Sequence, residues 1–152
     1  MHAKEKPRDK NLRKGRHSRP GGVYLITFVT NSRETLFTDL TTARLVISSL
    51  RKSKGAETLC FVVMPDHVHW LLQLRPHGEL SSTISGVKSA SARRINRHLG
   101  RSGHIWQDGY HDYALRREDD IREAARYIVA NPLRAGLVKS VAQYPHWDAK
   151  WL

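Results

Sequence analysis

The sequence predicts an α+β fold in which an antiparallel sheet carries helices on one face, in the split βαβ arrangement. Two observations lead to this class. The first six elements follow the order strand, helix, strand, strand, helix, strand, and only Pro65-Asp66 separates the second strand from the third, so that these two form a hairpin. An additional C-terminal helix follows, and the other face of the sheet is left open for a site or for this helix. The 152 residues are the size of one domain.

The elements are recognised by their periodicity and by their end signals. β-branched and aromatic runs predict strands at residues 23–30, 57–64, 67–74 and 109–116. A helix is expected from a cap at Thr38 or Asp39 to a stop at Gly55, because apolar residues follow helical spacing there. The next helices are expected at 78–100 and at 118–131, the latter ended by Pro132. The residues of helix 78–100 expected to point inward are Leu80, Ile84, Val87, Ile95 and Leu99.

Basic residues dominate the charge. The net charge of +12 arises from 26 Lys and Arg against 14 Asp and Glu, which predicts a polyanionic partner, first nucleic acid and second an anionic membrane surface. Residues 1–20 hold eight Lys or Arg and two acidic residues, hence half of that net charge, and have little apolar surface to bury. We therefore divide the chain into a basic flexible arm at 1–20 and a folded domain at 21–152.

The single cysteine, Cys60, lies in an apolar run, and no disulfide can form within the chain, which fits a reducing cytoplasm. No apolar stretch is long enough to span a bilayer, and no apolar segment follows the basic N-terminus as in a secretory signal. These features predict a cytoplasmic location without membrane association.

The stretch "MPDHVHWLL" at 64–72 places His67 and His69 on one face of the third strand, because alternate residues of a strand point the same way. Their Cβ atoms would lie roughly 7 Å apart, so that both imidazoles can converge on one ion. Val68, Trp70 and Leu72 would face the core on the other side. The alternative is that the histidines are structural and satisfied by hydrogen bonds.

A third metal ligand is expected, and the last helix offers one. Tyr127 and Asn131 lie one turn apart along the edge of that helix's buried stripe. A tyrosine beside a metal, on a basic protein, suggests phosphoryl chemistry, because the metal would polarise the phosphate that the phenol attacks. A packing role for Tyr127 remains open. Asp120 and Glu123 share the edge; favourable charge in the first turns of the helix is preferred over metal support for them.

Several motifs together resemble the REP-associated tyrosine transposases, a family of HUH-type single-strand DNA transposases. "MPDHVHWLL" resembles the HUH signature, and "ARYIVANPLRAGLV" (125–138) resembles the nucleophile helix of that family. "LRKGRHS" (12–18), "GGVYLITFVTNSRETLF" (21–37) and "WQDGYHDYALR" (106–116) are also similar, in the same order. The resemblance implies a ferredoxin-like fold and makes residues 21–152 a transposase catalytic domain.

The resemblance also implies roles for residues and partners. Tyr127 matches the nucleophile that forms a 5′-phosphotyrosine, His67 and His69 match the metal-binding pair, and Asn131 matches the third ligand. The implied metal is Mg²⁺ or Mn²⁺, although imidazole and amide ligands would also accept Zn²⁺. The implied substrate is single-stranded DNA of repetitive extragenic palindromes, which fold into hairpins beside a short tetranucleotide. A monomer is favoured over a homodimer.

Two basic groups are expected to bind this DNA. The arm contributes Arg13, Lys14, Arg16 and Arg19, and the helix at 78–100 contributes Lys88, Arg94 and Arg97. The helix cations also suit the helix dipole, which is the alternative explanation for them.

Three other functions are consistent with the sequence. A replication-initiator or relaxase-type nicking enzyme would share the chemistry but act at an origin. A non-catalytic nucleic-acid-binding protein would have structural histidines. A metal-dependent hydrolase of a small phosphorylated substrate would leave the basic arm unexplained.

Overall fold

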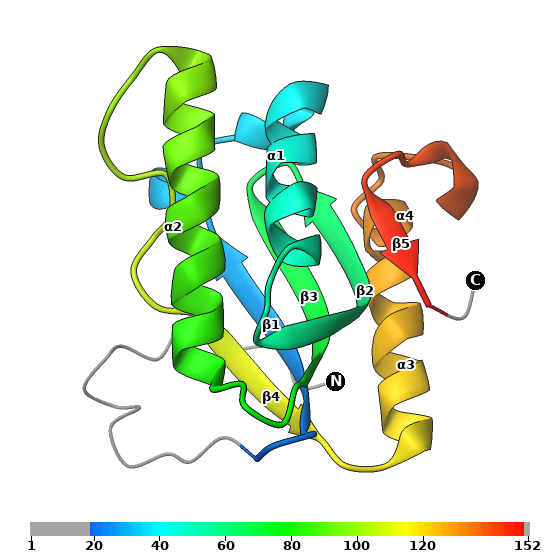
Figure 1. The fold of residues 1–152 in the computed structure, drawn as a ribbon. Helices are drawn as coiled ribbons and strands as arrows, with labels where there is room; N and C mark the ends of the chain where they lie inside the picture. The colour runs from blue at the N-terminus through cyan, green and yellow to red at the C-terminus, as the bar shows by residue number, and fades with distance from the viewer. Residues whose placement is uncertain (1–18, 151–152) are drawn as a thin grey trace.

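A computed structural model describes residues 19–150 and confirms the predicted fold class (Figure 1). The chain forms a five-stranded antiparallel sheet with helices on both faces. The strands are β1 (Val23–Val29), β2 (Ala56–Met64), β3 (His67–Leu74), β4 (His111–Leu115) and β5 (Trp147–Ala149). The α-helices are α1 (Leu40–Arg51), α2 (Leu80–Leu99), α3 (Glu118–Val129) and the short α4 (Asn131–Arg134).

The strand order is β4-β1-β3-β2-β5, which puts β3 in the centre of the sheet. β1 pairs along the whole of one edge of β3, from Val23 opposite Gln73 to Val29 opposite His67. β2 pairs with the other edge, as the short Pro65-Asp66 connection predicts, with a register irregularity between Thr58 and Cys60. β3 therefore has neighbours on both sides over its full length, which fixes the direction of every side chain on it.

The two faces of the sheet bury two separate apolar clusters. The face of the sheet under α1 and α2 carries four side chains of β3, namely Val68, Trp70, Leu72 and Leu74. All four are buried, as the sequence predicts. On the opposite face, α3 and the C-terminal segment cover Leu71 and its neighbours on β1 and β2. The last helix thus covers the face left open for it or for a site, and Figure 1 shows α3 on the other side of the sheet from α1 and α2.

The start of α1 and the end of α2 follow the predicted signals, but α1 ends at Arg51 rather than at Gly55, because the chain turns over residues 52–55 to enter β2 at Ala56. Asp39 caps α1 by accepting a hydrogen bond from the backbone N–H of Thr41 at 2.9 Å. α2 ends at Gly100, whose φ of 66° is the left-handed conformation that glycine adopts readily. The inward assignment of Leu99 is wrong: its side chain is 39% exposed, because the last turn of α2 continues beyond Ile95, the last residue of the helix that the core buries.

The described chain begins at the boundary of the predicted arm. The backbone N–H of Arg19 donates to the hydroxyl of Tyr24 at 2.9 Å, and the carbonyl of Arg19 accepts from Gly22 at 2.8 Å. Gly21 makes the turn with a φ of 76° and donates to the carbonyl of Leu74. Arg19 is therefore attached to the sheet, while Arg13, Lys14 and Arg16 lie outside the described residues.

The C-terminal segment adds a strand that the sequence pattern does not predict. Trp147–Ala149 pairs antiparallel with Cys60–Val62, and the hydroxyl of Tyr144 donates to the carbonyl of Val63 at 2.6 Å. The C-terminal segment thus covers one edge of the sheet. Within residues 19–150, no helix is long and apolar enough to cross a membrane.

Two glycines near α2 give a test of the packing. A Cβ on Gly86, inside α2, would meet nothing within 4 Å, whereas a Cβ on Gly78 would lie 2.1 Å from the carbonyl oxygen of Gly55. Gly86→Ala should raise the free energy of unfolding by about 0.5–1 kcal/mol, because glycine costs that much in a helix interior. Gly78→Ala should lower it by about 1–3 kcal/mol, because the backbone must move. Urea denaturation measures both, and shifts of the same sign would contradict this packing.

Candidate active site

His67 and His69 lie on the face of β3 that α3 covers. Their rings stand edge to face with centroids 4.9 Å apart, and both side chains are partly buried. Cross-strand pairing extends this row: His69 is opposite Thr27 of β1, and Thr27 is opposite His111 of β4. The predicted convergence of the two imidazoles is confirmed, and a third histidine that sequence reasoning did not single out stands on the same row.

Each imidazole has a polar partner at Nδ1. The Nδ1 of His67 lies 2.7 Å from a carboxylate oxygen of Asp66, and the Nδ1 of His69 lies 2.8 Å from the hydroxyl oxygen of Thr27. An ionised carboxylate only accepts, so the proton of neutral His67 resides on Nδ1. In the part of the chain that the structure describes, neither Nε2 has a hydrogen-bond partner. Such an arrangement orients a histidine for metal binding through Nε2.

His69 is held in its neutral form. Burial lowers the pKa of His69 to about 3, and the charges of His67, Arg134 and His111 act in the same direction. At neutral pH the ring is therefore uncharged, with one of its two nitrogens free of a proton. A neutral imidazole is the form that ligates metals.

Tyr127 lies near the C-terminal end of α3, next to the histidine pair. Its ring centroid is 6.0 Å from that of His69, with an interplanar angle of 72°. On α3 the helical spacing predicts a buried stripe of Ile121, Ala124, Ala125 and Ile128; the last three are buried, whereas Ile121, in the first turns, is only partly buried. Tyr127 is also only partly buried. Among residues 19–150, its hydroxyl has no hydrogen-bond partner. The phenol therefore remains available for a substrate.

The other tyrosines are placed differently. Tyr144 is buried, its hydroxyl donates to a backbone carbonyl, and burial raises its pKa to about 12. Tyr24 and Tyr110 are also buried, and Tyr113 is exposed on β4. Of the five, Tyr127 is the one whose ring contacts the His67–His69 pair in the described structure.

The helix that carries Tyr127 is shorter than predicted. α3 ends at Val129, and Asn131 begins the separate helix α4 rather than completing α3. The reason is Pro132, which has no N–H to donate and whose ring would clash with the carbonyl one turn earlier. Asn131 is partly buried, and its side-chain amide has no hydrogen-bond partner in residues 19–150. Its predicted role as a ligand stays a prediction.

Arg134 of α4 contacts Tyr127 directly, which the sequence reasoning missed. Its guanidinium carbon lies 4.0 Å from the centroid of the Tyr127 ring, and Nη2 donates to the Tyr127 carbonyl at 2.7 Å. Asp66 and Thr27 were missed as well. Asp66 directly precedes the histidine pair in sequence, and strand pairing places Thr27, so only Asp66 had a sequence signal.

Among residues 19–150, no third acidic, thiol or imidazole side chain is placed to share a metal ion with both His67 and His69. Within residues 19–150, no group of three or more His, Cys, Asp and Glu side chains could hold a metal ion. Asp120 and Glu123 are exposed on α3, in agreement with the preferred explanation as charges in the first turns of the helix. A metal held by His67 and His69 would need an amide, water or substrate oxygen to complete its shell.

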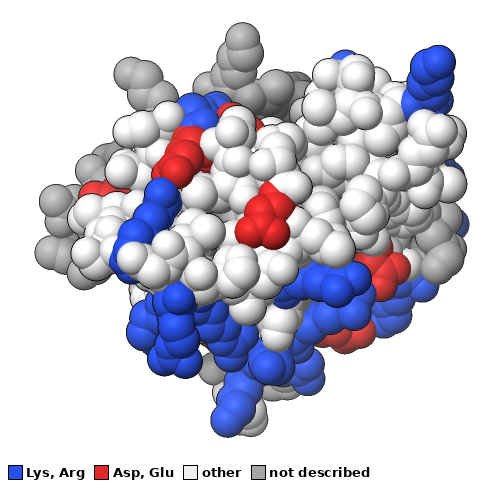
Figure 2. All heavy atoms as spheres, turned by 90° about the horizontal axis from the view of Figure 1, so that it is seen from above, with Lys and Arg blue, Asp and Glu red and all other residues white. Residues whose placement is uncertain are grey.

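The predicted DNA-binding residues of α2 lie on the opposite face of the sheet. Lys and Arg side chains gather along the lower edge of the face seen in Figure 2. Arg94 and Arg97 belong to α2, which packs beside α1. Arg94 lines a groove of about 420 Å³ between these helices, together with Lys52, Lys54 and His77. Its guanidinium lies 3.3 Å from the hydroxyl of Ser49, and Arg97 is exposed nearby.

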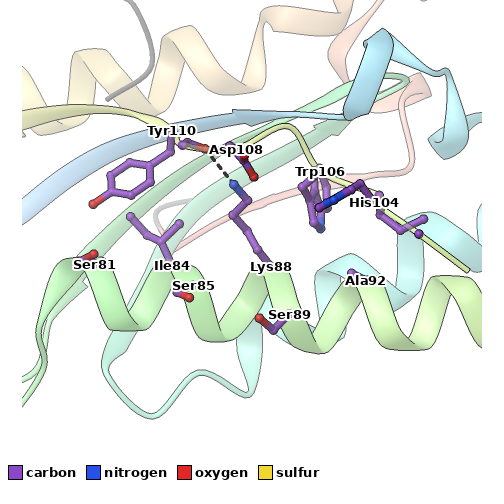
Figure 3. A pocket seen from close by; sticks show the side chains of 13 residues that line it. Ser81, Ile84, Ser85, Lys88, Ser89, Ala92, His104, Trp106, Asp108 and Tyr110 are labelled. Carbon is purple, nitrogen blue, oxygen red and sulfur yellow. Dashed lines mark hydrogen bonds between the residues drawn. The ribbon is translucent and has the colours of Figure 1, made fainter. Parts of the chain in front are cut away.

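The side chain of Lys88 makes hydrogen bonds within the protein. Its ammonium group donates to the carbonyls of Gln107 and Gly109, each at 2.8 Å, and so fastens the segment before β4 to α2. Figure 3 shows this side chain crossing a hollow of about 560 Å³ that Trp106 and Tyr110 also line. A structural role accounts for Lys88, and its expected contact with DNA stays a prediction. His67, His69 and Tyr127 do not line this hollow.

Comparisons with known proteins agree with this geometry. The family described as "Transposase IS200 like" matches residues 21–131. A REP-associated tyrosine transposase of Escherichia coli K12 is 29% identical over 129 residues, covering 82% of this chain and 74% of the relative. A Haemophilus influenzae protein named for the same group is 27% identical over 138 residues, covering 83% and 78%.

Solved structures give the same result. A REP-associated tyrosine transposase bound to a REP hairpin superposes with a TM-score of 0.72 at 27% identity, over 87% of this chain and 79% of that one. A Deinococcus radiodurans protein described as a transposase superposes with a TM-score of 0.55 at 28% identity, over 76% and 94%. The chain therefore belongs to the IS200-like transposase family and is a DNA transposase of the same kind as the REP-associated tyrosine transposases.

Proposed function

We propose that this transposase cleaves and rejoins single-stranded DNA through a covalent bond to Tyr127. The observation that carries the proposal is the position of the Tyr127 phenol beside a pair of imidazoles. Within residues 19–150, the Tyr127 hydroxyl and both Nε2 atoms have no hydrogen-bond partner. A nucleophile with an adjacent cation site is the arrangement that phosphoryl transfer needs.

In the proposed reaction the phenol oxygen of Tyr127 forms a bond to phosphorus. The bond from phosphorus to the 3′ oxygen breaks, and the 3′ oxygen takes up a proton as the phenol gives one up. The products are a 5′-phosphotyrosine and a free 3′-OH. Attack of a 3′-OH on the phosphotyrosine reverses the reaction, so joining needs no nucleotide cofactor.

The residues present fit a divalent cation. Nε2 of His67 and of His69 and the amide oxygen of Asn131 would hold Mg²⁺ or Mn²⁺, and the same set would accept Zn²⁺. When bound, such a cation polarises a phosphate oxygen and withdraws charge from it. Asp66 and Thr27 would hold the two rings in the ligating tautomer through their contacts at Nδ1.

The proposed substrate is a DNA hairpin of a repetitive extragenic palindrome with a flanking tetranucleotide. The solved relative with a TM-score of 0.72 is bound to a REP hairpin, which supports the hairpin part of the proposal. Arg94 and Arg97 would contact phosphates from the basic face, and Arg13, Lys14, Arg16 and Arg19 would contact the DNA beside the hairpin. A monomer would suffice, because His67, His69 and Tyr127 meet within one chain.

The nucleophile can be tested by Tyr127→Phe. This change removes one hydroxyl and keeps the ring, so it should abolish the covalent protein–DNA adduct while DNA binding persists. The adduct is measured as a shifted band on a denaturing gel after incubation with labelled hairpin DNA and Mg²⁺ or Mn²⁺. Fully paired duplex DNA should give no adduct, because its backbone is held in the helix.

Tyr113→Phe is the matched control, since Tyr113 is an exposed tyrosine on β4, and it should keep the wild-type adduct yield. An adduct that persists in Tyr127→Phe would assign the nucleophile elsewhere. A wild-type protein that binds the hairpin and never forms an adduct would support a non-catalytic nucleic-acid-binding protein instead.

The metal site can be tested by removing its imidazoles. His67→Ala and His69→Ala should each abolish metal-dependent adduct formation, and Asn131→Ala should cost less, because water can partly replace an amide ligand. Asp66→Asn should weaken Mn²⁺ binding by about 10–100-fold, because it disturbs the orientation of His67. Mn²⁺ titration followed by electron paramagnetic resonance measures the affinity, with the exposed His77→Ala as control. Equal adduct yields with and without a chelator would exclude the metal.

A further inference from the structure

We propose that Arg134 both positions the Tyr127 ring and supplies a positive charge that contacts the phosphate joined to it. The inference rests on the proposed function and goes beyond it, because it assigns phosphate binding to a side chain outside the metal site. It is based on two contacts of Arg134: one with the ring of Tyr127 and one with the backbone carbonyl of Tyr127.

The first part is the ring. The guanidinium carbon of Arg134 lies 4.0 Å from the centroid of the Tyr127 ring, within the range of a cation–π contact. His69 approaches the same ring edge to face, with centroids 6.0 Å apart. The ring therefore has a guanidinium at one face and the imidazole close by, and these two neighbours restrict its rotation.

The second part is the backbone. Nη2 of Arg134 donates to the carbonyl of Tyr127 at 2.7 Å, a short charge-assisted hydrogen bond. This carbonyl belongs to the last turn of α3, where helix carbonyls lack partners within the helix. The bond fixes the guanidinium to the residue whose ring it covers, so that the charge and the phenol keep one relative position.

The break between α3 and α4 makes these contacts possible. In one continuous helix, residues seven apart would lie two turns apart, about 10.5 Å along the axis. Pro132 ends α3, and the chain turns into α4, from which the Arg134 side chain extends back to Tyr127. The break that shortens the predicted helix thus also positions the arginine.

The remaining donors of Arg134 are available to a ligand. A guanidinium has five N–H groups, and within residues 19–150 Arg134 uses Nη2 alone for a hydrogen bond. Its side chain is exposed, whereas buried arginines would have their donors occupied. A planar guanidinium with free donors matches the oxygens of a phosphate group.

The position of this charge relative to the reaction gives it a function. As the phenol oxygen bonds to phosphorus and the 3′ oxygen leaves, negative charge spreads over the other phosphate oxygens, and the guanidinium stabilises it. After cleavage, the phosphate on Tyr127 stays next to Arg134. The chemical class that this residue recognises is therefore a DNA 5′-phosphate.

The test compares two substitutions, each of which removes one positive charge near Tyr127. Arg134→Gln removes the charge above the Tyr127 ring. Arg126→Gln removes an exposed charge from the residue before Tyr127, for which the described structure shows no ion pair. With labelled hairpin DNA and Mn²⁺, Arg134→Gln should form the adduct about 100-fold more slowly, the scale of losing one transition-state donor. Arg126→Gln should stay within about threefold of the wild-type rate, and Arg134→Lys should lie between.

A second measurement separates phosphate binding from a purely structural role. The dissociation constants of a 5′-phosphorylated and a 5′-hydroxyl oligonucleotide are compared in chelator, so that no metal contributes. The wild type and Arg126→Gln should prefer the phosphorylated strand, and Arg134→Gln should lose most of that preference. Thermal melting should show that Arg134→Gln remains folded, and Arg134→Lys, which keeps a charge, should restore part of the preference.

The outcomes distinguish the two proposals. A wild-type adduct rate in Arg134→Gln would overturn the inference, and so would a slow rate with an unchanged preference for the 5′-phosphate. A wild-type protein that forms no adduct would count against the proposed function alone. The oligonucleotide preference would still decide whether Arg134 binds a phosphate.

Discussion

The candidate site depends on the alternation of side chains along one central strand. β3 is paired on both edges, so that its register cannot shift without moving Val68, Trp70 and Leu72 out of the core. Those three buried side chains hold His67 and His69 on the other face. The apolar packing under α1 and α2 therefore fixes the two polar groups that lie on the side of α3.

Hydrogen bonds fix the orientation of the two imidazoles that β3 places on one face of the sheet. A partly buried imidazole can rotate and exchange tautomers unless something bonds to it, and here Asp66 and Thr27 each approach one Nδ1. Burial keeps His69 neutral, with a pKa of about 3. The cost of placing polar rings inside the fold is offset by these hydrogen bonds, and each ring keeps one nitrogen that no described residue contacts.

Local patterns predict β1 to β4, the helices α1 to α3 and the positions of His67, His69 and Tyr127, because periodicity of two or of about 3.6 residues records which side of an element is buried. They do not predict β5 or α4. Contacts between distant segments were not predictable in this way. Thr27 reaches His69 through strand pairing, 42 residues away in sequence. Arg134 reaches Tyr127 because Pro132 ends α3. In the continuous helix that the sequence predicts, the two residues would lie two turns apart, and no contact between them would be expected. Leu99 follows the helical pattern, but the pattern does not show where the core ends.

The strand β5 has a consequence for truncation of the chain at its C-terminal side. It covers Cys60–Val62, which would otherwise present unpaired backbone groups along a strand made of buried apolar residues. Uncovered edges of this kind recruit strands from other molecules. By pairing with this edge of β2, residues 147–149 should prevent aggregation, although they are distant from β2 in sequence. Proteins cut before Trp147 are expected to precipitate even when every residue of the reaction centre is present.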